Sequence, residues 1–107
     1  MSADIKVEES SGNIFEDLGF SEEEAGEELL KAQLGAEIFR ILKERKLTQT
    51  KAAKILGVRQ PEISRLKRGQ FSYYSVERLM RFLDRLNCEV SIHIRSENGS
   101  GERVIAV

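Results

Sequence analysis

Apolar residues recur at helical spacing from about residue 21 to residue 87, and this pattern predicts a mainly helical protein of four to five helices. The first predicted helix is long: it opens at Ser21 and runs to about Arg45, with a bend near Gly35. Glu24 follows Ser21 at the spacing of a capping box, in which each side chain hydrogen-bonds the other residue's backbone N–H. The stripe that this helix should bury comprises Leu30, Leu34, Ile38, Ile41 and Leu42.

Two short amphipathic runs follow, and Gly57 separates them. Thr48 is placed to cap the first run, Gly57 to take the positive φ of a tight turn, and Pro61 to fall in the opening turn of the second run. The positions that should face inward are Ala52, Ala53, Ile55, Leu56, Val58, Ile63 and Leu66. This pattern is typical of a helix-turn-helix, whose second helix enters the major groove of DNA.

Stepping about 100° per residue from an inward Ile63 turns Pro61, Ser64, Arg65 and Arg68 outward, with Arg59 and Gln60 at the leading end. Arginine pairs bidentately with guanine and glutamine with adenine, whereas Gln49 and Ser64 suit phosphate oxygens or neighbouring base edges. The predicted DNA-binding residues are Gln49, Arg59, Gln60, Ser64, Arg65, Lys67 and Arg68. Additional contacts to the DNA backbone are predicted for Thr50, Lys51, Tyr73 and Tyr74. The alternatives are a solvated helix face for the basic residues and core packing for the two tyrosines.

Gly69 is expected to end the second run, and Ser75 to cap a last helix. The buried stripe of that helix should comprise Val76, Leu79, Met80, Leu83 and Leu86, with Arg78, Arg81 and Arg85 outside.

Beyond Asn87 the period becomes two, because Val90, Ile92 and Ile94 alternate with polar residues, and a half-buried strand is predicted. Asn98-Gly99 is a strong turn signal, so residues 103–107 can fold back as a hairpin. The same strand can instead pair with its copy in a second chain, or both pairings can coexist. Val90, Ile92 and Ile94 are therefore candidate dimerisation residues.

Charge is unevenly distributed, although the 17 basic and 18 acidic residues nearly cancel, with a net charge of −1. Residues 1–30 hold ten acidic residues and one lysine, whereas residues 43–68 hold nine basic residues and two glutamates. The basic segment coincides with the turn motif and predicts binding to a polyanion. The acidic segment is either a solvated face or a docking surface for a basic partner protein.

At 107 residues and 40% hydrophobic content, the chain should form one compact domain. We expect a flexible acidic tail over residues 1–13, a helical domain over 14–87 and a strand or hairpin over 88–107 that serves as a dimerisation element. No apolar run reaches membrane-spanning length and no signal peptide is evident, so a cytoplasmic protein is expected. Cys88 and His93 supply neither a metal-ligand set nor a catalytic pair, so we expect no metal, no cofactor and no enzymatic activity.

The segment LTQTKAAKILGVRQPEISRLKRG, residues 47–69, resembles the lambda-repressor and Cro-like (XRE) helix-turn-helix superfamily. A narrower resemblance, over roughly residues 13–95 and including NIFEDLGF and QFSYYSVERLMRFLDRLNCEVSIHI, is to the HigA-like antitoxins that accompany RelE/HigB-like toxins. It implies a lambda-repressor-like fold, an operator-binding dimer that represses its own operon, and neutralisation of an mRNA-cleaving toxin.

The superfamily resemblance further implies a backbone contact for Gln49 and groove-facing roles for Gln60, Ser64 and Arg65. Arg59 departs from the superfamily pattern, in which a small capping Ser or Thr is usual. Either the helix tolerates a weaker cap, or Arg59 has been recruited for DNA at a stability cost of about 1 kcal/mol.

The sequence thus predicts a sequence-specific regulator of double-stranded DNA, acting as a homodimer on a palindromic operator. Its two recognition helices should enter successive major grooves about 34 Å apart. The alternative is a protein-interaction module that binds a toxin-like partner through the acidic helix or the terminal strand, with a mainly structural helix-turn-helix.

Overall fold

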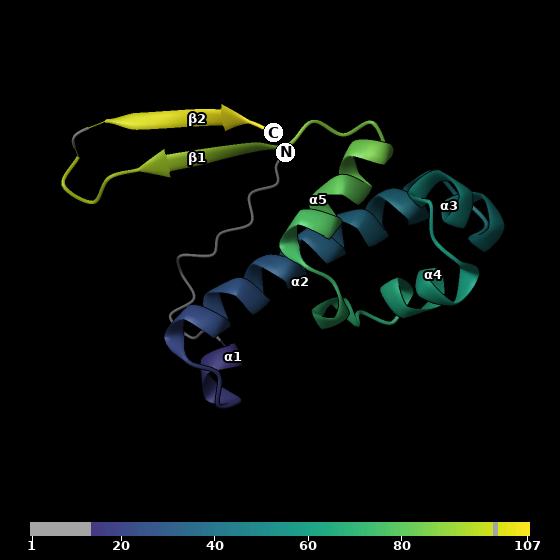
Figure 1. The fold of residues 1–107 in the computed structure, drawn as a ribbon, viewed down its shortest axis with the longest axis horizontal. Helices are drawn as coiled ribbons and strands as arrows, with labels where there is room; N and C mark the ends of the chain where they lie inside the picture. Colours follow the sequence, from purple (N-terminus) through teal and green to yellow (C-terminus); the bar gives the residue numbers. More distant parts are fainter. Residues whose placement is uncertain (1–13, 100) are drawn as a thin grey trace.

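The computed structural model describes residues 14–99 and 101–107, so the tail expected over residues 1–13 lies outside the described residues. A helical body carries a two-stranded hairpin that projects from one end (Figure 1). The elements in chain order are α1 (Ile14–Asp17), α2 (Glu22–Glu44), α3 (Gln49–Leu56), α4 (Gln60–Lys67), the 3-10 turn η1 (Phe71–Tyr73), α5 (Val76–Arg85), β1 (Ser91–Arg95) and β2 (Glu102–Ala106). The predicted mainly helical fold with a short carboxy-terminal hairpin is confirmed.

Three helices begin where their capping residues predict. The Ser21 hydroxyl accepts from the Glu24 backbone N–H at 3.1 Å, and the Glu24 carboxylate accepts from the Ser21 N–H at 3.0 Å. The hydroxyl groups of Thr48 and Ser75 likewise accept from backbone N–H groups three residues further on, each at 3.1 Å. Each cap satisfies a backbone donor that the first helical turn leaves unpaired.

The turn between α3 and α4 depends on Gly57, which takes a left-handed conformation with φ of 72° at the end of α3. A side chain at this φ would be strained. The following helix starts at Gln60 behind Arg59, whose side chain makes no capping hydrogen bond. Arg59 therefore does not supply the side-chain acceptor that a Ser or Thr at this capping position would give to the backbone N–H groups of α4.

The core lies where α2, α3, α4 and α5 meet. Its fully buried large side chains are Ile38, Leu42, Ile63, Leu66, Leu79 and Leu86. The predicted stripe of α5 needs one correction: Phe82 lies in the core, whereas Val76 and Met80 are only half-buried. In the core Phe82 meets the ring of Tyr74 edge to face, with centroids 5.5 Å apart.

Two further residues that the hydrophobic pattern placed inside are exposed. Leu30 lies on α2 ahead of the part of that helix that the core covers, in which Leu34 is the first apolar side chain packed against the cluster. Ile55 lies outside the face of α3 that is buried, which comprises Ala52, Ala53 and Leu56. Helical spacing alone therefore overestimates the width of the buried face.

Helix α2 is one continuous helix through Gly35, where a bend was predicted. Gly35 is buried, and the ring of Phe71 lies against its backbone in the space that a β-carbon would fill. The glycine expected at a bend is therefore the place where η1 packs onto α2.

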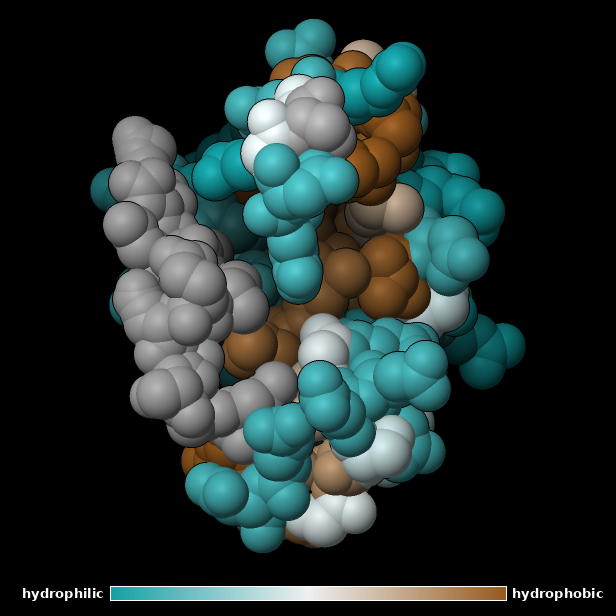
Figure 2. Space-filling model, turned by 90° about the vertical axis from the view of Figure 1, so that its left-hand side faces the viewer, coloured by the Kyte–Doolittle hydropathy of each residue, from teal (hydrophilic) through white to brown (hydrophobic). Residues whose placement is uncertain are grey.

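The hairpin pairs β1 with β2 in antiparallel register, with Ile92 opposite Ile105 and Ile94 opposite Arg103. Every residue of both strands is exposed, which corrects the prediction of a half-buried strand. Among the described residues from Cys88 onward, Cys88 and Val90 pack against the core, and both precede β1. The core is made by α2, α3, α4 and α5, and no described residue of β1 or β2 is buried against it. Seen from the hairpin end, the molecule is hollowed below the hairpin, and the floor of the hollow is mostly hydrophobic (Figure 2).

Candidate nucleic-acid interface

One side of α4 and the start of α3 form an open polar hollow. Its lining residues are Gln49, Gln60, Pro61, Ser64 and Arg68. The Gln49 side-chain amide donates to the Ser64 hydroxyl at 3.3 Å, which links the two helices across the hollow. The Gln60 amide donates to the Thr50 hydroxyl at 3.1 Å in the same way. We call this set of five lining residues the α4 shelf.

The α4 shelf suits contact with a polyanion because its only charged lining residue is Arg68. Glu62, in the first turn of the same helix, is turned to another side. Its carboxylate receives a hydrogen bond from the Arg78 guanidinium at 3.2 Å. Arg78 thereby keeps the one acidic side chain of α4 occupied, a role that sequence reading missed because the two residues are 16 positions apart.

Arg65 lies beside the shelf and is not among its lining residues. It is half-buried, and its guanidinium sits over the ring of Tyr73 at 4.4 Å from the centroid. Stacking on an aromatic face holds the long side chain in one place while leaving its N–H groups able to donate. Tyr73 itself is 69% exposed, so the pair forms a rigid, accessible edge next to the shelf.

Tyr74 is placed differently from its neighbour, and the predicted contact with the DNA backbone is wrong for it. Only 2% of Tyr74 is exposed, and its hydroxyl lies 3.4 Å from the Glu62 carboxylate, to which it donates. Burial, reinforced by the Glu62 charge, raises the pKa of the Tyr74 phenol, so the group stays protonated as a donor. The alternative prediction, that this tyrosine packs in the core, holds for Tyr74, whose ring makes an edge contact with Phe82.

The remaining predicted contact residues surround the shelf. Arg59 and Lys51 are exposed near the starts of α4 and α3. Lys67 lines a second hollow on the other side of α4, where Lys43 and Lys46 join it from α2 and the turn after α2. Sequence reasoning named Lys67 as a DNA contact but found Lys43 and Lys46 only as part of a charge count, because their meeting with Lys67 depends on how α2 packs against α4. Cations therefore flank the shelf on more than one side.

Other kinds of site find no support in the described part of the chain. No group of three or more His, Cys, Asp or Glu side chains there is arranged to hold a metal ion. None of its helices combines the length and the apolar character that crossing a bilayer requires.

The helices and the shelf define a helix-turn-helix protein. A family model described as "Helix-turn-helix domain" matches residues 14–95. The chain belongs to this family.

A solved structure described as "Putative XRE Family Transcriptional Regulator" has a similar fold, with a TM-score of 0.67 and 35% sequence identity. The match covers 73% of this chain and 88% of that one. The helix-turn-helix of this protein is therefore of the XRE type, as its turn segment indicates. No curated protein matches the chain.

Proposed function

We propose that this protein is a sequence-specific, double-stranded DNA-binding transcriptional regulator that works in the cytoplasm as a homodimer on a palindromic operator. The observation that carries the proposal is the α4 shelf: glutamine, serine and arginine side chains gathered on one exposed helix face, with the acidic side chain of that helix bound elsewhere. Membership of the helix-turn-helix family supports the same function. The mechanism is binding, not chemistry.

In this mechanism α4 lies in the major groove and α3 crosses the DNA backbone. In this proposal Gln60 and Arg68, which line the shelf, read base edges, and Arg65 joins them from its stacked position on Tyr73. Gln49 and Ser64, already linked by a hydrogen bond, offer their remaining donors to phosphate oxygens. Arg59, Thr50, Lys51, Lys67 and Tyr73 complete the proposed contact surface. A protein bound at a promoter excludes polymerase, so repression is the expected outcome.

The test is selection of bound fragments from random duplex DNA at physiological salt. We expect enrichment of an inverted repeat whose half-sites are one helical turn apart. On that sequence Arg68→Ala should weaken binding by about 1–3 kcal/mol and relax the preference at one position. Arg95→Ala is the matched control, because it removes the same charge from an exposed hairpin residue away from α4.

Salt gives a second readout of the same binding. If about six phosphates are contacted, the log–log slope of affinity against salt should be near −5. Equal loss of affinity on random and selected DNA in the Arg68 variant would assign this residue to a phosphate. A selection without any enriched sequence would overturn the proposed function.

We further propose that the regulator is the antitoxin of a RelE/HigB-like pair and represses its own operon. The resemblance over residues 13–95 is one support, and the acidic segment is the other. Residues 14–30, in α1 and the opening of α2, hold seven acidic and no basic residues, and Ile14 and Leu18 are exposed among them. A protein that cleaves mRNA must attract a polyanion, so its active surface is basic and suits an acidic partner.

The antitoxin role is tested with the product of a small RelE-like reading frame beside this one. Co-expression should give a stable complex and suppress mRNA cleavage, and reversing Glu16 and Asp17 to lysine should weaken the complex. The control reverses Glu89 and Glu97, two exposed acidic residues outside α1, α2 and the strands. A product that neither binds nor is inhibited would remove the antitoxin role and leave the DNA-binding proposal standing.

A further inference from the structure

The most exposed aromatic side chain among the described residues belongs to Tyr73, in η1 beside the shelf. It is 69% exposed, whereas Phe20 is 39% exposed and the other aromatic side chains of this part of the chain are less exposed still. An exposed ring gains little from the hydrophobic effect, so its role lies in what it contacts. The contact in the structure is with the guanidinium of Arg65 on α4.

The chain reverses at the end of α4, and this reversal brings η1 back toward Arg65. Gly69 takes a left-handed conformation with φ of 76°. The Gln70 N–H donates to the Arg65 carbonyl at 3.1 Å, and the Gly69 N–H donates to the Leu66 carbonyl at 3.1 Å. Together these two bonds form a Schellman motif, which ends a helix at a glycine. The local sequence therefore starts η1 directly beyond the last turn of α4.

Contacts between distant segments then fix η1 on α2. The ring of Phe71 lies against the backbone of the buried Gly35, in space that a β-carbon would fill. The Ser72 hydroxyl donates to the Glu28 carboxylate at 2.7 Å. That carboxylate also forms an ion pair of 3.3 Å with Lys31, and both side chains of the pair are mostly buried. Two consecutive residues of η1 are therefore attached to α2.

Tyr73 is held between these attachments and the buried Tyr74 that follows it. Its ring presents a face to Arg65, whose Cζ lies 4.4 Å from the ring centroid. Burial raises the pKa of the Tyr74 phenol, and the nearby charge of Arg65 partly offsets this rise. Arg65 thus lies close to two consecutive tyrosines, which restrict where its long side chain can go.

An arginine restricted in this way suits base recognition. Arg65 follows Pro61 by four residues and precedes Arg68 by three, and residues at such spacings are neighbours on one side of a helix. Pro61 and Arg68 both line the shelf, so Arg65 adjoins it. A free arginine side chain loses rotamer freedom when it binds, and stacking it beforehand removes part of that cost. The stacked guanidinium keeps N–H groups that can donate to the two acceptors of guanine.

We propose that Tyr73 is a positioning residue for base recognition. Its ring holds the Arg65 guanidinium at the edge of the shelf, and Arg65 reads a guanine through two parallel hydrogen bonds. This role of Tyr73 rests on the proposed function, because it takes α4 to lie in the major groove. It makes the tyrosine ring a support for Arg65, and it adds η1 to the elements on which base preference depends.

The test measures affinity for the selected operator and for copies of it with one base pair changed at a time. Arg65→Ala should reduce the preference at one base pair by about five- to 150-fold, equivalent to about 1–3 kcal/mol. Tyr73→Leu should reduce the preference at the same base pair about two- to fivefold, as expected for an exposed cation–π contact. Tyr73→Phe should keep the preference, because phenylalanine presents the same ring face. Neither Tyr73 variant changes the charge, so the salt slope should stay the same.

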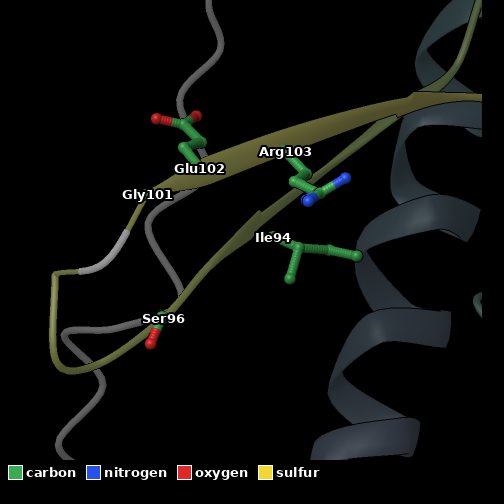
Figure 3. Close-up of a pocket in the computed structure, with 5 residues that line it drawn as sticks. All are labelled: Ile94, Ser96, Gly101, Glu102 and Arg103. Atoms are coloured by element: carbon green, nitrogen blue, oxygen red, sulfur yellow. The ribbon is translucent and has the colours of Figure 1, made fainter.

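A double variant shows whether Tyr73 acts through Arg65. In the Arg65→Ala background, Tyr73→Leu should cause no further loss of preference, because the side chain that it supports is gone. Phe20→Leu is the matched control for the tyrosine, since it removes an exposed ring that lies ahead of α2. Arg103→Ala is the control for the arginine, and Figure 3 shows Arg103 on the hairpin, directed to the same side as Ile94. Neither control should alter the base preference.

The stack itself is measured on the full chain without DNA. Protons above an aromatic ring are shielded by its ring current, so the side-chain protons of Arg65 should resonate further upfield in the wild type than in Tyr73→Leu. Arg65→Ala identifies their NMR signals. The upfield position should persist in Tyr73→Phe. Circular dichroism should show intact helices in every variant, since Tyr73 is mostly exposed.

Any of three results would overturn this role of Tyr73: no NMR shift difference between the wild type and Tyr73→Leu, an unchanged base preference in Tyr73→Leu, or an equal loss of affinity on selected and random DNA in both Tyr73 variants. The third result would make the Tyr73 hydroxyl a phosphate contact. If the wild type selects no DNA sequence, the proposed function fails and this role fails with it, even where the NMR signals show the stack. If selection succeeds and Tyr73→Leu keeps the full preference, only the role of Tyr73 fails.

Discussion

At the scale of single residues, neighbours in the sequence play different roles. Tyr73 is exposed and supports Arg65, whereas Tyr74 is buried against Phe82 and donates to Glu62. Sequence reading treated the two tyrosines alike, because nothing local says which ring turns toward α5. The pairing of Arg78 with Glu62 is equally invisible to local patterns, since it joins two different helices.

Gly35 gives the sharpest prediction at this scale. In an exposed helix, replacing glycine by alanine stabilises by about 0.5–1 kcal/mol. At Gly35 the new methyl group would overlap the ring of Phe71 near its attachment point, so the whole aromatic side chain must move. We expect Gly35→Ala to lower the free energy of unfolding by about 1–3 kcal/mol, as overpacking does. Urea denaturation measures this change.

The control is Gly26→Ala in the same helix, where a β-carbon would meet nothing within 4 Å. This variant should be slightly more stable than the wild type. Adding Phe71→Leu to Gly35→Ala should restore part of the loss. A Gly35→Ala protein as stable as Gly26→Ala would show that Phe71 does not hold η1 against α2.

At the scale of elements, capping residues and turn glycines in the sequence predicted where helices begin and end. Ser21, Thr48 and Ser75 cap the helices they were expected to cap, because a cap is a hydrogen bond between residues three positions apart. The hairpin also formed within the chain, since Asn98-Gly99 can turn the strand locally. Its exposure was not predicted, because the alternating pattern shows that one face is apolar without showing what covers it.

A prediction at this scale concerns the first residues of α4. Arg59 occupies the capping position without a capping hydrogen bond. Arg59→Ser should supply the missing acceptor and raise the free energy of unfolding by about 1 kcal/mol, while it weakens DNA binding if Arg59 contacts DNA. Thermal or urea denaturation and a binding titration on the selected operator measure the two effects.

Two further variants separate the causes. Arg59→Ala removes the same charge without adding an acceptor, so it should weaken DNA binding without stabilising. Thr48→Ala removes an existing cap and should cost about 1 kcal/mol. An Arg59→Ser protein with unchanged stability and unchanged DNA affinity would mean that Arg59 is neither a poor cap nor a DNA contact.

At the scale of the whole molecule, the shelf and the acidic segment lie on different elements. The shelf belongs to α3 and α4, and the acidic segment to α1 and the opening of α2 (Figure 1). The near-zero net charge conceals this division, because acidic and basic residues are concentrated in different parts of the chain.

The sequence alone determined the four longer helices, the caps at Ser21, Thr48 and Ser75, the turn at Gly57 and the family of the fold, and it left open whether the terminal strand pairs within the chain. Each of these follows from residues a few positions apart, whose spacing is set by the backbone geometry of a helix, a turn or a strand. Only the tertiary structure decided which exposed-looking residues are buried and which polar groups meet. Tyr74 in the core, Phe71 against Gly35, Glu62 held by Arg78 and the uncovered hairpin all depend on how distant segments pack, and packing depends on shape and volume across the whole core.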